Sequence, residues 1–352
     1  NGTVTIITTN IGNHFTFNGS LNGFGGTMAF GSSLGTYTFN SKTNSNPATG
    51  STAAIFDLGN GTATLNNFNG AGLTYNLGAL AGGPNTTLSG RTNNSPTPGT
   101  TYSIGASGNS TVFSGRIIDG LDSVSLVKVG AGSLLLDGAS TYSGSTVVSN
   151  GVFGGNGSIT SPLTIMPGAT LSPGDPIGTF TVNNNATLNG TVLMALNQNT
   201  SDMLTVSGAI SASGSLIVTN VGPDIINGTT FHLFNKAVTG LTDTLPAKDP
   251  AGTTSYVWTD HVSIDGSITL TSGGINVNPS PTNILASVSG NVLSLSWPTD
   301  HTGWTLQAQT NTVSTGLSND WSNVAGSTST NMVNMTINPA NGVVFYRLFY
   351  QP

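Results

Sequence analysis

Residues 126–153, LVKVGAGSLLLDGASTYSGSTVVSNGVF, decide the fold of this chain. Short runs of Val and Leu alternate here with turns made of Gly, Ser and Asn-Gly, and the apolar residues do not recur at helical spacing. Residues 133–137 and 145–149 each have the composition of a strand, and a turn follows each of them, at Gly138 and at Asn150-Gly151. This regular succession of strand and turn predicts the stacked rungs of a β-solenoid.

The same stretch resembles the autotransporter-associated β-strand repeat of large secreted bacterial proteins. That repeat combines a Lys-x-Gly-x-Gly start, a Leu-x-Leu strand, a Thr-Tyr-x-Gly turn and a Thr-x-Val strand. The matching residues are Lys128, Gly130, Gly132, Leu134, Leu136, Thr141, Tyr142, Gly144, Thr146 and Val148. Segments further along, up to about residue 270, are similar to those that follow such a repeat. The resemblance implies a solenoid and a place outside the cell, and it says less about function.

The composition of the whole chain also favours β-structure. Its 352 residues include 48 Gly, no Cys and no Glu, and charged residues make up 6%, against roughly 25% in an average globular domain. Few of the side chains favour helices, whereas abundant Thr, Ser, Asn and Gly suit strands and turns. Disorder is the alternative for so polar a chain, but regularly spaced Val, Leu, Ile and Phe supply enough apolar surface for a core. We therefore expect an all-β protein.

Charge and cysteine content exclude several classes of partner and site. Without Cys, the chain has neither disulfides nor a thiolate metal site. The net charge is -6 and the few Lys and Arg form no stripe, so nucleic acid is not an expected partner. No run of about 18 apolar residues predicts a transmembrane helix. The sequence begins at Asn1 without a Met or a signal sequence, which favours a secreted protein, extracellular or at the cell surface, after signal-peptide removal.

Composition divides the chain into four parts. Residues 1–125 are rich in short strands and are expected to be solenoid rungs, although a β-sandwich of similar strand spacing would have much the same sequence. Residues 126–271 form the solenoid with the repeat. Residues 272–283 combine Gly, Ser, Asn and Pro and are the predicted linker. Residues 284–352 contain three of the four Trp and six or seven short strands, which predicts a small immunoglobulin-like or fibronectin-like β-sandwich with an aromatic core.

A search for catalytic chemistry finds few candidates. The four His are far apart and show no zinc spacing, and no nucleophile elbow or P-loop is present. The carboxylates of Asp119 and Asp122, and the group Asp260, His261 and Asp265, are compatible with a cation site or an acid pair, but turn formation explains them more simply. We expect no enzyme, and no catalytic, cofactor or metal site. An inverting pair of Asp brought together by the rungs stays open.

Two classes of function are consistent with these features. The first is a secreted structural protein that assembles with copies of itself, head to tail, into an extracellular filament, sheath or adhesive fibre, because solenoid ends carry unpaired strand edges. The alternative is an extracellular β-helix protein that binds or degrades carbohydrate, with surface glycans as partners; a third possibility is the passenger of an outer-membrane transporter. The residues predicted to carry assembly are Val4, Ile6, Ile7, Phe345, Tyr346, Phe349 and Tyr350.

Overall fold

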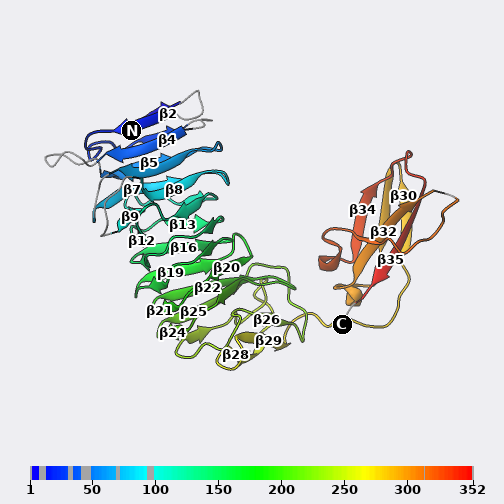
Figure 1. The fold of residues 1–352 in the computed structure, drawn as a ribbon. Helices are drawn as coiled ribbons and strands as arrows, with labels where there is room; N and C mark the ends of the chain where they lie inside the picture. The colour runs from blue at the N-terminus through cyan, green and yellow to red at the C-terminus, as the bar shows by residue number, and fades with distance from the viewer. Residues whose placement is uncertain are drawn as a thin grey trace.

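The computed structural model describes residues 2–7, 13–30, 35–40, 49–68, 72–92, 99–312 and 314–350. Within these ranges the chain is almost entirely β-structure, with two short 3-10 helices, η1 (Thr299–His301) and η2 (Ser327–Ser329). A parallel β-solenoid of about nine turns is followed by small antiparallel sheets at the C-terminus (Figure 1). The predicted all-β class and the β-solenoid are confirmed; where a small β-sandwich was predicted, the structure has small antiparallel sheets.

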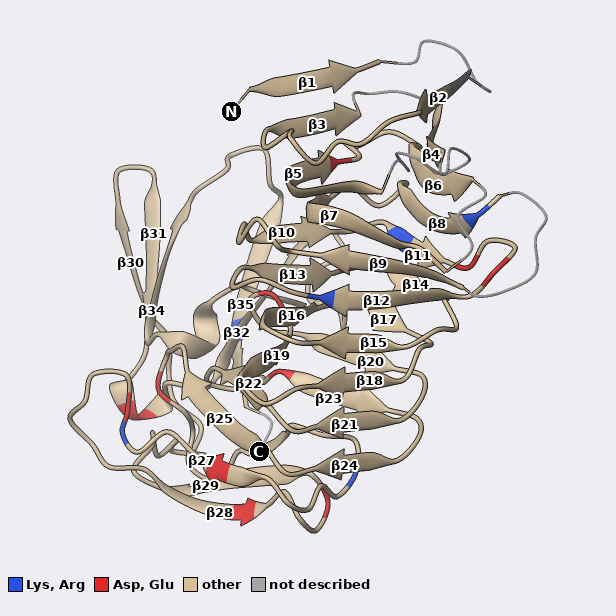
Figure 2. Cartoon of the chain, turned by 90° about the vertical axis from the view of Figure 1, so that its left-hand side faces the viewer, with Lys and Arg blue, Asp and Glu red and all other residues tan. Residues whose placement is uncertain are grey.

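One long parallel sheet runs along the solenoid from end to end (Figure 2). Its ten strands, in spatial order, are β1 (Thr3–Ile6), β3 (Thr27–Phe30), β5 (Gly50–Asp57), β7 (Thr74–Ala81), β9 (Thr100–Ile104), β12 (Val124–Lys128), β15 (Thr146–Val148), β18 (Leu163–Ile165), β21 (Ala186–Leu188) and β24 (Ile210–Ala212). The strands that precede residue 126 belong to the same sheet as the strands of the repeat. They are therefore rungs of one solenoid.

Three further parallel sheets complete the solenoid. The seven-stranded sheet contains β10 (Thr111–Phe113), β13 (Ser133–Leu136), β16 (Gly151–Gly155), β19 (Ala169–Pro173), β22 (Thr191–Leu196), β25 (Ser215–Asn220) and β27 (Thr242–Thr244). The five-stranded sheet contains β11 (Arg116–Ile118), β8 (Thr87–Arg91), β6 (Thr64–Phe68), β4 (Gly35–Asn40) and β2 (Asn13–Phe17). The four-stranded sheet contains β14 (Ala139–Ser140), β17 (Ser158–Ile159), β20 (Thr179–Val182) and β23 (Met203–Val206). Described rungs before β9 contribute two strands each to the parallel sheets, and the rungs that begin with β9 to β21 contribute three.

Apolar side chains stack in columns along the inside of these sheets. In the seven-stranded sheet the register aligns one inward position of every strand from β13 to β25, at Leu134, Phe153, Leu171, Val192 and Leu216. All five side chains are buried, and burial of each stabilises the fold by about 1.5–3 kcal/mol. The alternating pattern of the sequence thus places one apolar residue per strand on the same line, and the lines form the core.

Aromatic rings fill the N-terminal half of the core. The rings of Phe39 and Tyr75 are stacked with their centroids 5.5 Å apart, and Tyr102 follows Tyr75 at 5.8 Å. The buried hydroxyl of Tyr102 donates a hydrogen bond of 2.6 Å to the carbonyl oxygen of Ser89. These rungs therefore bury large rings where the later rungs bury Leu and Val.

An antiparallel sheet closes the C-terminal end of the solenoid (Figure 1). We call it the cap, and it consists of β26 (Thr230–His232), β29 (Ser267–Ser272) and β28 (Val257–His261). Its inner face is apolar, since Phe231, Ile268 and Leu270 are buried and join the solenoid core. The strand direction changes here, and the parallel stacking of rungs ends at the cap.

The C-terminal unit consists of two antiparallel sheets of three strands. One contains β30 (Leu285–Ser289), β31 (Val292–Ser296) and β34 (Met332–Thr336), and the other contains β33 (Ser322–Asn323), β32 (Thr305–Asn311) and β35 (Val343–Phe349). Its small core is formed by Leu295, Trp297 and Leu306. The likeness to an immunoglobulin or fibronectin module stays a prediction.

Candidate functional site

The edge strand β1 carries Val4 and Ile6 of the residues predicted for assembly, and Ile7 follows it directly. Val4 and Ile7 are 45% and 64% exposed, and Ile6 packs partly against the solenoid core. In the described part of the chain, β1 pairs with β3 alone. The outer edge of β1 is thus an open sheet edge that carries apolar side chains, a combination that favours pairing with another strand.

The backbone N–H and C=O groups of successive β1 residues point alternately to the two edges of the strand. The carbonyl oxygen of Gly2 accepts a hydrogen bond of 3.1 Å from the N–H of Thr27 on β3. Because successive residues of a strand direct their N–H and C=O groups to opposite sides, Val4 also faces β3, whereas Thr3 and Thr5 direct theirs outward. The outward groups of Thr3 and Thr5 are therefore the ones that an added strand would bond.

The other predicted assembly residues lie in the C-terminal unit, away from β1. Phe345, Tyr346 and Phe349 belong to β35, and Tyr350 follows that strand directly. Tyr346 packs against the small core, and the ring of Tyr350 stacks on Trp304 with 5.3 Å between centroids. Figure 1 shows the N-terminus at the first rungs of the solenoid, away from β35 in the C-terminal unit. The structure does not bring the two sets of predicted residues together within one chain.

The predicted linker, residues 272–283, is hydrogen-bonded on both sides. On the solenoid side, the N–H of Ile275 donates to the carbonyl oxygen of Ile225 (2.7 Å). On the other side, Asn278 donates its N–H to the carbonyl oxygen of Asp300 (2.7 Å), and Trp304 Nε1 donates to the carbonyl oxygen of Asn278 (2.8 Å). We call this segment the strap, because it ties the C-terminal unit to the end of the solenoid.

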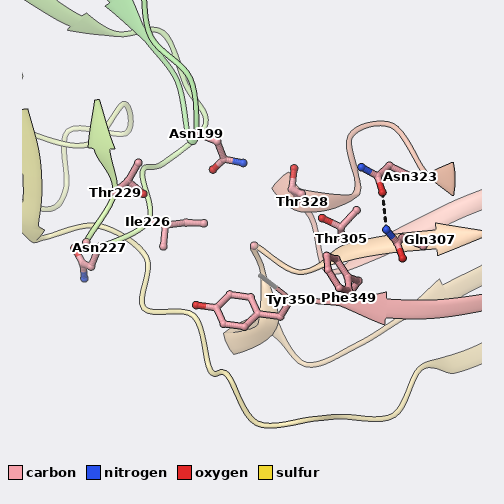
Figure 3. A pocket seen from close by; sticks show the side chains of 12 residues that line it. Asn199, Ile226, Asn227, Thr229, Thr305, Gln307, Asn323, Thr328, Phe349 and Tyr350 are labelled. Atoms are coloured by element: carbon pink, nitrogen blue, oxygen red, sulfur yellow. Dashed lines mark hydrogen bonds between the residues drawn. The ribbon is translucent and has the colours of Figure 1, made fainter. Parts of the chain in front are cut away.

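A cleft of about 750 Å³ opens between the solenoid end and the C-terminal unit (Figure 3). Asn199, Ile226 and Thr229 line it from the solenoid side, and Thr305 and Tyr350 from the C-terminal unit. Twelve residues line the cleft, and all of them are uncharged. The walls offer amides, hydroxyls and aromatic rings to a bound molecule.

Some polar groups of the cleft are already engaged within the protein. The amide of Asn227 donates to Asn276 Oδ1 (2.7 Å) and accepts from the N–H of Gly274 (2.8 Å). Gln307 donates to Asn323 Oδ1 (2.8 Å), as Figure 3 shows, and accepts from Arg347 Nε (2.8 Å). These residues form fixed parts of the walls.

Other polar side chains of the cleft are available to a ligand. Within the described residues, no protein hydrogen bond involves the following side chains: Asn199, Thr229, Thr305, Thr328 and Tyr350. Asn199 lies on a turn that Asn197 holds, since Asn197 Oδ1 accepts the N–H groups of Asn199 (3.1 Å) and Thr200 (2.9 Å). Sequence reasoning missed this cleft because its two walls are about a hundred residues apart in the chain and share no motif.

The carboxylates that the sequence analysis weighed as a cation site are engaged within the protein, Asp119 and Asp265 by nearby N–H and hydroxyl groups and Asp122 by Arg91, whose Nη2 lies 3.8 Å from Asp122 Oδ2. Asp119 Oδ1 accepts the N–H groups of Val124 (2.8 Å) and Ser143 (3.0 Å). Asp265 Oδ1 accepts from the N–H and hydroxyl of Ser267, and these hydrogen bonds hold the pKa of Asp265 below its usual value. In the described ranges, no group of three or more metal-ligating side chains is found.

An acidic pair that the sequence analysis did not single out joins the last rung to the cap. Asp243 on β27 aligns with Leu216, so a carboxyl group occupies the next position of the apolar column described above. Burial, and then a hydrogen bond with Asp260 of β28, raises the pKa of Asp243 to about 6. One carboxyl oxygen of Asp243 is buried without a partner. Asp243 is thus protonated below about pH 6 and can then donate to Asp260.

Lys128, the first residue of the repeat pattern, is buried inside the solenoid wall. Its Nζ donates to the carbonyl oxygens of Val129 (2.8 Å), Gly130 (2.9 Å) and Asn150 (3.1 Å). Burial lowers the pKa of Lys128 to about 8, so the ammonium group is mostly protonated at neutral pH. Its three N–H donors match three carbonyl groups in the turns of two successive rungs.

Comparisons with known proteins bear on one segment of the chain. The family model of the passenger-associated-transport-repeat matches residues 126–153. No curated protein matches the chain. The described helices are too short and too polar to cross a bilayer. The repeat match and the β-solenoid together fit the passenger domain of an autotransporter, and they suggest a secreted protein.

Proposed function

We propose that this chain is a structural, non-catalytic passenger whose solenoid is a stalk that joins copies of itself outside the cell. The observation that carries the proposal is the difference between the two solenoid ends. The cap covers the C-terminal rungs with an antiparallel sheet. At the other end, β1 presents an open edge, with Val4 on the strand and Ile7 just after it exposed. An uncovered parallel edge is a template for one more strand.

The joint that we propose is head to tail. Because the cap closes the last rungs, the partner of β1 is the C-terminal unit of a neighbouring copy. Its apolar contacts would come from Phe345, Tyr346, Phe349 and Tyr350 on and after β35, of which Phe349 is among the exposed large apolar side chains. Low charge supports this contact, since a chain with 6% charged residues has little electrostatic repulsion between copies.

The test is a proline substitution on the outward side of β1. Thr5→Pro removes the outward N–H of Thr5, whereas the bonds between β1 and β3 use the other residues. We expect fibres of the unaltered chain in negative-stain electron microscopy over a range of concentrations, and monomers of Thr5→Pro with an unchanged circular dichroism spectrum. Thr5→Val keeps the N–H and is the matched control, so it should still form fibres.

Two results would overturn the joint. Fibres of Thr5→Pro as long as those of Thr5→Val would mean that the β1 edge is not used, and deletion of residues 1–9 should give the same answer. Discrete dimers, measured by analytical ultracentrifugation, would mean that two β1 edges meet head to head. Monomers of the unaltered chain at every concentration would end the proposal of self-assembly.

A further inference from the structure

We infer that the cleft between the solenoid end and the C-terminal unit binds a neutral oligosaccharide. The proposed joint and the cleft share Phe349 and Tyr350. The strand β1, the other half of the joint, contributes nothing to the cleft, so variants of β1 separate the two proposals. The inference rests on three features of the cleft: its uncharged lining, the polar groups available on both walls, and the strap that holds the walls in place.

The lining selects against charged ligands. All twelve lining residues are neutral. Arg347 contacts two of them, but it is not itself a lining residue, and its guanidinium group is engaged by Gln307 Oε1 (2.8 Å) and by the ring of Trp321 (4.3 Å to the centroid). A carboxylate, sulfate or phosphate that leaves water for such a site therefore gains no opposite charge from the lining. An apolar ligand is also disfavoured, because it would cover hydroxyl and amide groups without bonding them. A neutral molecule that carries many hydroxyl groups satisfies both conditions.

The available groups suit the two kinds of surface that a sugar ring presents. A pyranose has hydroxyls around its rim and C–H groups on its faces. The amide of Asn199 and the hydroxyls of Thr305 and Tyr350 can donate to, and accept from, the rim hydroxyls. The ring of Phe349 lines the same cleft and is 39% exposed, so it offers an apolar surface to the C–H groups.

The two walls keep a defined spacing because both are tied to the strap. Ile275 bonds to the solenoid wall at Ile225, and Asn278 bonds to the other wall at Asp300 and Trp304. A direct contact adds to these, since the hydroxyl of Ser329 lies 3.4 Å from Gln198 Oε1. The volume of about 750 Å³ falls within the roughly 300–1,000 Å³ of ligand sites in general. A preformed two-walled site of this kind fits an oligosaccharide better than a flat surface does.

The first experiment is isothermal titration calorimetry of the full chain with four hexasaccharides. The β-linked hexamers of glucose, mannose and xylose are the neutral probes, and hexagalacturonate is the charged probe of similar size. We expect at least one neutral hexamer to bind, and hexagalacturonate to bind at least about tenfold more weakly. Failure of all three neutral probes to bind overturns the inference, and so does equal or tighter binding of hexagalacturonate.

Paired variants then locate the site. We expect Thr305→Ala, Tyr350→Phe and Asn199→Ala each to weaken binding about three- to tenfold, the effect of one lost hydrogen bond. Thr310→Ala, on the exposed end of the same strand as Thr305, and Asn183→Ala, exposed on the solenoid, are the matched controls and should bind normally. Equal thermal unfolding midpoints show that the variants are folded.

Variants on the two walls of the cleft test separately whether each wall contacts the sugar. If Thr305→Ala and Tyr350→Phe weaken binding but Asn199→Ala does not, the C-terminal unit binds alone and the two-walled site is wrong. If the matched controls weaken binding as much as the cleft variants, the sugar binds elsewhere. Thr5→Pro should keep full sugar binding, so a failure of self-assembly and a failure of sugar binding are distinguishable.

Discussion

Lys128 shows how a chain with very few charges uses one of them. In the sequence it is the first residue of the repeat pattern, and in the structure its buried ammonium group satisfies three backbone carbonyl groups of two successive rungs. Among these partners, Val129 and Gly130 belong to one turn and Asn150 to the next. A single side chain thus ties neighbouring turns together where backbone ladders end.

We predict that Lys128→Met destabilises the solenoid by about 2–4 kcal/mol, because the methionine fills the space but leaves buried carbonyl groups without donors. The measurement is thermal unfolding at pH 7 followed by circular dichroism. Lys248→Met is the control, since Lys248 is exposed and makes one long contact, 3.4 Å from the carbonyl oxygen of Gly252. Equal unfolding midpoints for the two variants would contradict the structural role of Lys128.

At the scale of elements, the change from parallel rungs to the antiparallel cap is where the apolar columns stop. The column from Leu134 to Leu216 continues into Asp243 on β27, which meets Asp260 on β28. Partial burial of Asp243 at this position favours the neutral form of its carboxyl group. The contact between the last rung and the cap is therefore expected to be stronger when Asp243 is protonated.

We predict that the cap is more stable in acid than in weak base. The pKa of Asp243 is raised from its usual 3.8 to about 6 in the folded chain, so its contribution is full below about pH 4 and is lost as the pH rises through 6. The difference in thermal unfolding midpoint between pH 5 and pH 8 should shrink in Asp243→Leu, which extends the apolar column.

Asp320→Leu is the matched control for this pH test, because Asp320 is exposed in the C-terminal unit. It should keep the full difference between the two pH values. The carboxyl group of Asp202, whose pKa burial also raises to about 6, is present in both variants and contributes equally. A pH dependence that is identical in Asp243→Leu and in the unaltered chain would show that the acidic pair does not stabilise the cap.

At the scale of the whole molecule, the strap determines how the two units are joined. A Gly-, Ser- and Pro-rich segment predicts a flexible linker, yet residues 275 and 278 are hydrogen-bonded to different units and only a short stretch lies between them. Hydrogen bonds from Asn278 and His301 also hold the pKa of Asp300 below its usual value. The strap is thus built from backbone groups that composition alone does not reveal.

We predict that Trp304→Phe loosens the C-terminal unit. The phenyl ring can still stack on Tyr350, but the bond from Trp304 Nε1 to the carbonyl oxygen of Asn278 is lost, at a cost of about 1 kcal/mol. Small-angle X-ray scattering should show a larger and more variable maximum dimension. Trp321→Phe is the control, because within the described residues the Trp321 side chain makes no hydrogen bond to the strap. If both variants scatter alike, the strap does not restrain the unit.

The strands and turns that repeat along the chain could be predicted from the sequence. Alternation at Leu134 and Leu136, and turns at Gly138 and Gly151, predict strands and rungs, because side-chain direction and turn geometry are local properties. The cleft depends on residues such as Asn199 and Thr305, which only the packing of two units brings together. The pair of Asp243 and Asp260 was missed for the same reason, since β27 and β28 belong to different sheets and only the packing of the cap on the last rung brings the two residues together.

The direction of the backbone hydrogen bonds between rungs has a mechanical consequence. In the solenoid, each rung is joined to the next by backbone hydrogen bonds that run along the long axis. A pull along that axis loads all rung boundaries in series, so the weakest boundary opens first, and the rung that opens adds its own contour length before the next one yields. A solenoid of this kind lengthens in steps under tension, so a sudden load is converted into extension instead of being transmitted at full force.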